Sequence, residues 1–79
     1  IYPNPASSIT CIPIENNKEQ VIKVNLKNVL GQQVDVLFNG TVQAGEKNIF
    51  MFANQYPEGV YMVEIIAGDK IYNQKVIIK

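Results

Sequence analysis

Polar and apolar residues alternate with a period of two along most of this chain. Successive side chains of a β-strand point to opposite faces of its sheet, so the alternation predicts strands with one buried and one solvated face. The clearest segment is 20–26, in which aliphatic residues share one face and polar residues the other: Ile22, Val24 and Leu26 against Lys23, Asn25 and Lys27. No segment has the 3.6-residue period of an amphipathic helix. The pattern therefore predicts an all-β fold.

Six segments carry the strand pattern, and turn-forming residues separate them at intervals of roughly 8–12 residues. The segments are 9–14, 20–26, 33–38, 45–53, 60–67 and 70–79. Asn39-Gly40 and Gly68-Asp69 are dipeptides that favour tight hairpins, so each is predicted to join two neighbouring strands. Pro13 has no backbone N–H and therefore makes the first segment an edge strand or ends it.

Two of these segments carry apolar residues on both faces. In segment 33–38 the alternation predicts that Val34, Val36 and Phe38 share one face. In segment 45–53 phenylalanines and aliphatic residues occupy opposite faces, so both faces are expected to be partly covered.

The chain has 79 residues, a length that supports one domain, and we expect that domain to span 1–79. About seven short antiparallel strands without helical crossovers favour a β-sandwich, with a small barrel as the alternative. No apolar run reaches the roughly 20 residues that a transmembrane helix needs. The abrupt start at Ile1 suggests the tail of a longer protein.

The composition argues against catalysis, metal binding and nucleic-acid binding. The chain has no histidine, which removes the usual general base and the commonest metal ligand. Cys11 is the only cysteine, so no internal disulfide forms, and we expect a small buried hydrophobe at this position. Seven lysines balance seven acidic residues and no arginine is present, so no basic stripe for nucleic acid exists. We expect no cofactor and no enzymatic activity.

Four short motifs stand out against this background: Tyr2-Pro3-Asn4-Pro5, Gly31-Gln32-Gln33-Val34, Pro57-Glu58-Gly59-Val60-Tyr61, and Lys75-Val76-Ile77-Ile78-Lys79. The two prolines of the first motif favour an extended lead-in. Gly31 is a candidate for a turn with positive φ, and Gln32 for bonding the free backbone groups of that turn. Tyr61 is expected to pack with its hydroxyl bonded at the rim. In the last motif Val76 and Ile78 share one strand face, and the lysines share the other.

In this order and spread over essentially all 79 residues, the motifs resemble those of type A C-terminal sorting domains of the Bacteroidetes type IX secretion system. The resemblance implies an immunoglobulin-like β-sandwich at the C-terminus of a cargo protein. It also implies that an outer-membrane shuttle and translocon recognise the domain, in which the final residues act as a handle, and that a sortase-like peptidase then removes it. The cargo would pass through the periplasm to the cell surface or the medium.

Two other functions stay open on the sequence. The first is an immunoglobulin-like accessory module that binds carbohydrate or a surface partner, although the chain has no tryptophan, and Tyr2, Tyr56 and Tyr72 lie near strand ends. The second is a cap that stabilises its parent domain. The last strand is also a candidate edge for pairing with a partner strand or with a second copy.

Overall fold

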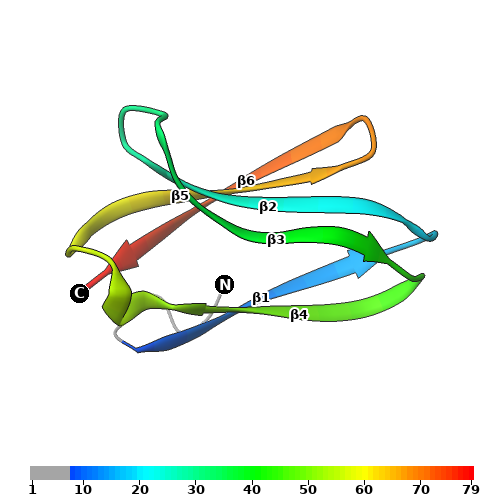
Figure 1. Cartoon of the computed structure of the whole chain (residues 1–79), viewed down its shortest axis with the longest axis horizontal. Helices are drawn as coiled ribbons and strands as arrows, with labels where there is room; N and C mark the ends of the chain where they lie inside the picture. The colour runs from blue at the N-terminus through cyan, green and yellow to red at the C-terminus, as the bar shows by residue number, and fades with distance from the viewer. Residues whose placement is uncertain (1–7) are drawn as a thin grey trace.

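A computed structural model of the chain describes residues 8–79, which form six strands and one short 3₁₀ turn (Figure 1). The strands are β1 (Ile9–Asn16), β2 (Gln20–Asn28), β3 (Gln33–Val42), β4 (Gly45–Phe52), β5 (Gly59–Ala67) and β6 (Lys70–Ile78), and the 3₁₀ turn η1 spans Ala53–Gln55. Within residues 8–79 no helix is long and apolar enough to cross a membrane. The all-β prediction is confirmed.

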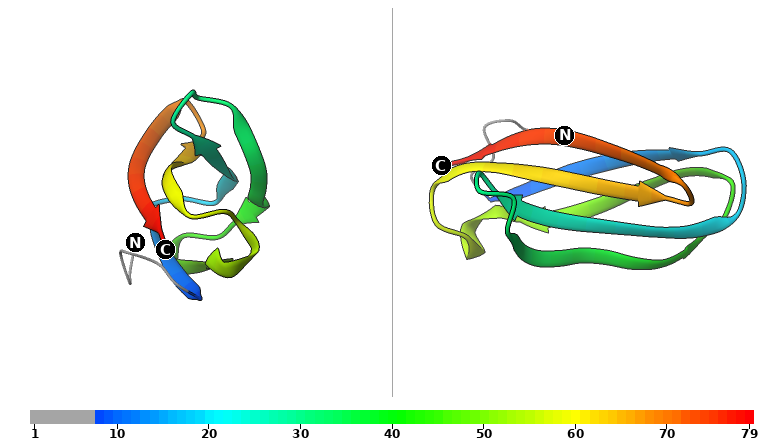
Figure 2. Two further views of the ribbon diagram at one scale, coloured as in Figure 1. Left: turned by 90° about the vertical axis from the view of Figure 1, so that its left-hand side faces the viewer. Right: turned by 90° about the horizontal axis from the view of Figure 1, so that it is seen from above.

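The strands form two antiparallel sheets, which pack face to face around one core (Figure 2). One sheet pairs β1 with β4, and the other has the order β3-β2-β5-β6. This is the pairing of strands B and E, and of C′, C, F and G, in an immunoglobulin domain. The structure therefore confirms the β-sandwich with immunoglobulin-like topology and excludes the barrel.

The core is built from the inner faces of both sheets. Ile22, Val24 and Leu26 of β2 have no exposed surface, as the alternation predicted. They pack in one cluster with aliphatic residues of the β1–β4 sheet and with Val63 and Val76 of β5 and β6. Cys11 is buried too, in agreement with its expected role. Each large core side chain contributes about 1.5–3 kcal/mol through burial of apolar surface.

A tyrosine at the start of β5 ties the strand to the segment before it. The Tyr61 side chain is 8% exposed, and its hydroxyl donates a hydrogen bond of 2.6 Å to the Pro57 carbonyl oxygen. This arrangement is the tyrosine corner of immunoglobulin-like domains. The Tyr56 ring packs against that of Tyr61, and its hydroxyl donates a 2.7 Å bond to Asp35. Burial, together with the Asp35 carboxylate, raises the pKa of Tyr56 to about 12.

The outer face of β2 is less solvated than the sequence predicted. Asn25 is 3% exposed, and its side-chain amide donates a 3.1 Å bond to the Glu64 carboxylate on β5. The Lys27 ammonium donates a 2.9 Å bond to the other Glu64 oxygen. Hydrogen bonds from Lys27 and then from Asn25 lower the pKa of Glu64. The expectation of a solvated polar face missed this cross-strand network, which needs two strands that lie far apart in the sequence.

The predicted turn at Asn39-Gly40 is wrong. Both residues lie within β3 and pair with Lys23 and Ile22, and Gly40 does not adopt a positive φ. The chain leaves β3 after Val42 and passes through 43–44 into β4, which belongs to the other sheet. Pairing with β2 outweighs the local preference of Asn-Gly for a hairpin.

The predicted face of β3 is also wrong. Two register shifts in the β2–β3 ladder leave Val34 and Leu37 without a directly opposed residue, which is the geometry of β-bulges. As a consequence Phe38 packs on the core, whereas Val36 turns outward and is exposed. A strict period of two cannot predict a bulge.

The outer face of β4 is open, in contrast to the expected partial cover on both faces. Ile49 and Met51 are buried, but Phe50 is 57% exposed and Phe52 is 51% exposed.

Pro13 does not end β1, which continues to Asn16. It occupies a strand that pairs with β4 alone among the described strands.

We predict that Tyr61→Phe lowers the free energy of unfolding by about 1 kcal/mol, because it removes one buried hydrogen bond while keeping the ring. Urea denaturation followed by circular dichroism measures the change. Tyr72→Phe is the matched control, since the Tyr72 ring is half exposed on β6. An equal loss in both variants would contradict a stabilising tyrosine corner.

We predict that Glu64 contributes to acid unfolding. Its folded pKa lies below the ordinary value of 4.5, so its stabilisation is present above that pH and is lost as the pH falls through the folded pKa. Urea titrations from about pH 6 to about pH 3 should show a shallower decline of stability for Glu64→Gln than for the unmodified chain. Asp69→Asn, in the exposed β5–β6 turn, serves as the control. Parallel curves for Glu64→Gln and the unmodified chain would refute the contribution.

Candidate functional site

Three of the four sequence motifs meet at one end of the sandwich. The Gly31-Gln32 turn joins β2 to β3, Gly59-Val60-Tyr61 begins β5, and the last motif ends β6. Figure 2 (left) looks onto this end, where the C-terminus lies. The fourth motif, Tyr2-Pro3-Asn4-Pro5, lies outside the described residues. We call residues 28–32, 59–61 and 75–79 the motif end.

Strand pairing holds two of these motifs together. Gly59 lies opposite Ile78, Val60 opposite Ile77, and Tyr61 opposite Val76. Val76 and Ile78 are buried in the core, whereas Lys79 is exposed. The expected division of the last motif into an inward and an outward face is therefore confirmed, and its inward residues are part of the fold.

The Gly31-Gln32 motif lies beside Tyr61, because Asn28, the last residue of β2, pairs with Tyr61. Gly31 has a φ of +81° and donates its N–H to the Asn28 carbonyl, which closes the turn. The Asn28 side-chain oxygen accepts bonds of 3.0 Å from the N–H groups of Leu30 and Gln32. Gln32 was expected to bond the backbone of the turn, but its side chain instead accepts a bond from the Asn28 amide. Asn28 is thus the organising residue, which the sequence reasoning missed.

This turn presents two apolar side chains to solvent. Val29 is 74% exposed and Leu30 is 78% exposed, the highest values among the large apolar side chains of residues 8–79. The sequence reasoning did not name them as candidates. Two adjacent apolar residues inside a turn, with no strand to bury them, could have indicated an exposed apolar surface. Exposed apolar side chains on a loop that is fixed by hydrogen bonds are typical of a docking surface.

A groove of about 360 Å³ runs between this turn and the start of β5. Its lining is mostly apolar and includes one cation, the Lys27 ammonium. The other lining residues are Asn28, Val29, Gly31, Val60, Tyr61, Met62 and Asn73. Such a groove can hold an apolar side chain or an extended segment of a partner protein. Its lining contains no carboxylate, serine, threonine or cysteine side chain.

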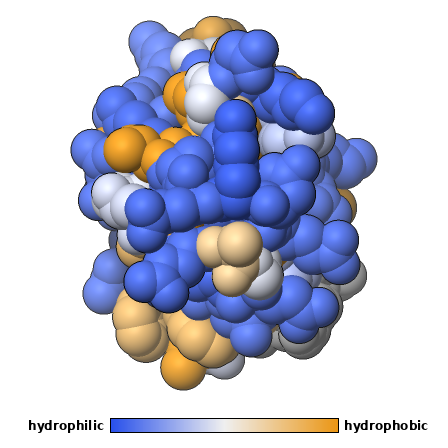
Figure 3. All heavy atoms as spheres, turned by 90° about the vertical axis from the view of Figure 1, so that its right-hand side faces the viewer, coloured by the Kyte–Doolittle hydropathy of each residue, from blue (hydrophilic) through white to orange (hydrophobic). Residues whose placement is uncertain are grey.

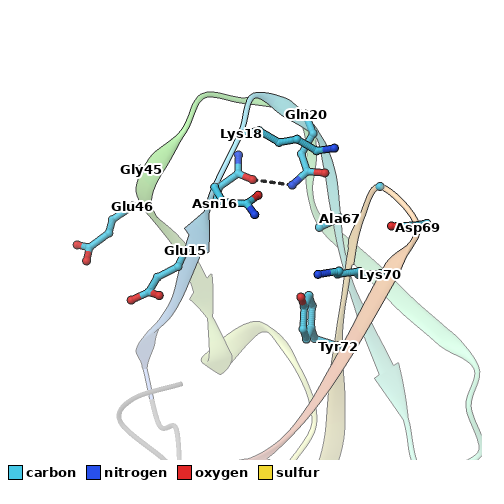
Figure 4. Close-up of a pocket in the computed structure, with 12 residues that line it drawn as sticks. Glu15, Asn16, Lys18, Gln20, Gly45, Glu46, Ala67, Asp69, Lys70 and Tyr72 are labelled. Carbon is cyan, nitrogen blue, oxygen red and sulfur yellow. Dashed lines mark hydrogen bonds between the residues drawn. The ribbon is translucent and has the colours of Figure 1, made fainter.

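The opposite end of the sandwich is largely hydrophilic (Figure 3). It contains a hollow of about 550 Å³ between the end of β1 and the β5–β6 hairpin. Figure 4 shows its lysines, carboxylates and amides, with Tyr72 at one side. The Gln20 amide donates a 2.6 Å bond to the Asn16 side-chain oxygen, which orders the rim. Among residues 8–79 no group of three or more histidine, cysteine or carboxylate side chains is placed to hold a metal ion.

Comparison with known proteins supports the resemblance. The family model for the secretion system C-terminal sorting domain matches residues 1–79, the full length of the chain. Searches of curated proteins and of solved structures gave no match. A sorting domain is a secretion signal and not a catalytic domain, and it implies export across the outer membrane to the cell surface or the extracellular space. The chain belongs to the family of secretion system C-terminal sorting domains and is a secretion signal of the type IX system.

Proposed function

We propose that residues 1–79 act as one C-terminal domain whose motif end is the surface that the type IX machinery recognises. The observation that carries this proposal is the meeting of three motifs at one end through the pairing of β2 with β5 and of β5 with β6. None of the three motifs that the structure describes lies at the opposite end. Exposed apolar side chains next to a groove supply contact area at the motif end.

The last motif has two roles in this proposal. Val76 and Ile78 anchor β6 in the core, while Lys75, Ile77 and Lys79 belong to the outward side of the strand. The outward side contributes two positive charges, so an acidic surface on the partner would complement it.

The partners follow from the family. An outer-membrane shuttle and translocon bind the folded domain with its cargo attached on the N-terminal side, and a sortase-like peptidase cuts the connection near the Tyr2-Pro3-Asn4-Pro5 motif. The catalytic group belongs to the peptidase, and the sorting domain is its substrate. Cargo then stays at the cell surface or is released.

A carbohydrate-binding module gains no support from Tyr56 and Tyr72, the tyrosines near strand ends that the structure describes. Tyr56 lies near the motif end, bonded to Asp35, whereas Tyr72 lines the hollow at the opposite end. Sugar-binding surfaces need aromatic rings that lie together. These two rings lie toward opposite ends of the sandwich.

The deletion of residues 75–79 is a poor test of recognition, because it removes buried Val76 and Ile78 as well as the outward lysines. Loss of such core side chains costs about 2–5 kcal/mol for large residues and would unfold a small domain. A test of recognition must therefore change exposed residues only.

We predict that Val29→Thr/Leu30→Thr lowers export of a fused periplasmic reporter about tenfold or more, because burial of an exposed Val or Leu side chain against a partner contributes about 1.5–3 kcal/mol. The assay compares reporter in the medium and in the periplasm of a type IX-competent host. Val21→Thr/Ile71→Thr, two exposed residues in the strands that begin at the opposite end, is the matched control.

Circular dichroism should show that both double variants stay folded. Equal export of the two variants would reject the motif end as the recognised surface. It would leave the assignment of the chain as a secretion signal intact.

A further inference from the structure

Strand β4 has an edge that no described strand occupies. The Ala53 N–H donates to the Ser8 carbonyl, and this bond sets the alternation of the β1–β4 ladder. By this alternation Ile49 and Met51 direct their backbone groups to β1, whereas Asn48, Phe50 and Phe52 direct theirs to the other edge. Along this stretch, the backbone N–H and C=O groups at the outer edge of β4 therefore have no strand partner within residues 8–79.

The position next to this edge is filled in a typical immunoglobulin domain. There, strand D pairs with strand E in the sheet of order A-B-E-D. Here β3 occupies the place of C′ and passes through 43–44 directly into β4, the equivalent of E. Within residues 8–79 no strand takes the place of D.

The other strands that end a described sheet carry features that discourage pairing with a foreign strand. Pro13 lies in β1, two bulges interrupt β3, and lysines 70 and 75 lie on β6. Each of these is a known device against edge-to-edge association. The β1–β4 ladder has no register shift, and residues 48–52 of β4 contain neither a charge nor a proline.

The side chains on this part of β4 are apolar on both faces. Phe50 and Phe52 are half exposed on the outer face, next to half-exposed Ile9 on β1. Ile49 and Met51 point into the core. A strand placed alongside β4 would bury both phenylalanine side chains and extend the core face.

We propose that the β4 edge pairs with β4 of a second copy of this chain, antiparallel about a twofold axis through Phe50. In this register Phe50 lies opposite Phe50 of the second copy, and Ile49 lies opposite its Met51. Such a pairing is self-complementary, because a twofold axis perpendicular to the sheet keeps outer face against outer face and core face against core face. The proposal goes beyond the sorting function and does not depend on it.

Charge favours this register over its neighbours. Glu46 and Lys47 lie outside residues 48–52, so neither charge faces a residue of the second β4. The two Glu46 side chains are about eight residues apart along the joint sheet, or roughly 27 Å, well beyond the screening length of about 8–10 Å. Moving the twofold axis by four residues, from Phe50 to Glu46, would place the two carboxylates opposite each other, which is destabilising.

The interface is small. One strand edge with two phenylalanine side chains buries less than the roughly 1,600 Å² of a standard interface. Association should therefore be weak and concentration-dependent, with a dissociation constant of about 10 µM or higher.

Disulfide trapping tests the register. Cys11 lies directly opposite Phe50 within one copy, so the experiment uses the full chain with Cys11→Ala. In that background Phe50→Cys should give covalent dimers under mild oxidation, because directly opposed residues have Cα atoms about 4.5–5.5 Å apart, within disulfide range.

Phe52→Cys is the matched control, since it shares the strand, the face and the exposure of Phe50. In the proposed register Phe52 lies about four residues, or roughly 13 Å, from its copy, which is too far for a disulfide. Equal trapping of the two cysteines, or trapping of neither, would overturn the proposal.

Sedimentation velocity measures self-association independently of disulfide formation, in chains that keep Cys11. The weight-average sedimentation coefficient should rise with concentration for the unmodified chain and for Ile71→Lys, and should stay constant for Phe50→Lys, because a lysine on the edge blocks pairing. An unmodified chain that stays monomeric at millimolar concentration would also refute the pairing of β4 with β4 of a second copy.

Discussion

The antiparallel pairing of β2 with β5 is the interaction on which the rest of this structure depends. The ladder runs from Ile22 opposite Ala67 to Asn28 opposite Tyr61 and joins two hairpins that are distant in the sequence. A two-stranded hairpin alone is at best marginally stable in water. Once joined, the two hairpins form a four-stranded sheet whose inner face can bury the β1–β4 pair. The Asn25–Glu64–Lys27 network lies across the same ladder and fixes its register from the outer face.

The same pairing creates the motif end. Because β2 ends where β5 begins, the turn after β2 lies next to Tyr61, and because β5 pairs with β6, the last residues of the chain lie on its other side. The tyrosine corner then fixes the approach to β5 through the Pro57 carbonyl. Three motifs that are weak one by one in the sequence thus form a single surface, and the fold sets its geometry.

The sequence predicted those features that depend on neighbouring residues. The hairpin at Gly68-Asp69, the buried face of β2 and the inward Val76 and Ile78 follow from turn chemistry and the period of two. Most of the wrong predictions involve residues whose partners are distant. Gly40 is held in β3 by Ile22, and burial of Asn25 depends on Glu64. Local propensity cannot anticipate such pairings.

The sequence predicted only part of the candidate site, because the rest depends on contacts that form only in the folded chain. The motifs themselves could be found, since glycine, proline and a terminal lysine-flanked strand stand out by composition. The role of Asn28 could not, because several residues in this part of the chain can bond a turn and only the folded backbone selects one. The exposure of Val29 and Leu30 follows from the role of Asn28, because the turn that its hydrogen bonds close directs both side chains away from the core.

The position of the last motif links folding to recognition. Val76 and Ile78 lie in the core and are opposite Tyr61 and Gly59, so the outward side of the same strand is in place only when the sandwich is formed. In a domain of this size one or two lost core contacts are a large part of the total stability. A machinery that reads this end would therefore bind a folded domain and pass over a truncated or unfolded one. Under the proposed recognition, the signal reports that the domain carrying it has completed its fold.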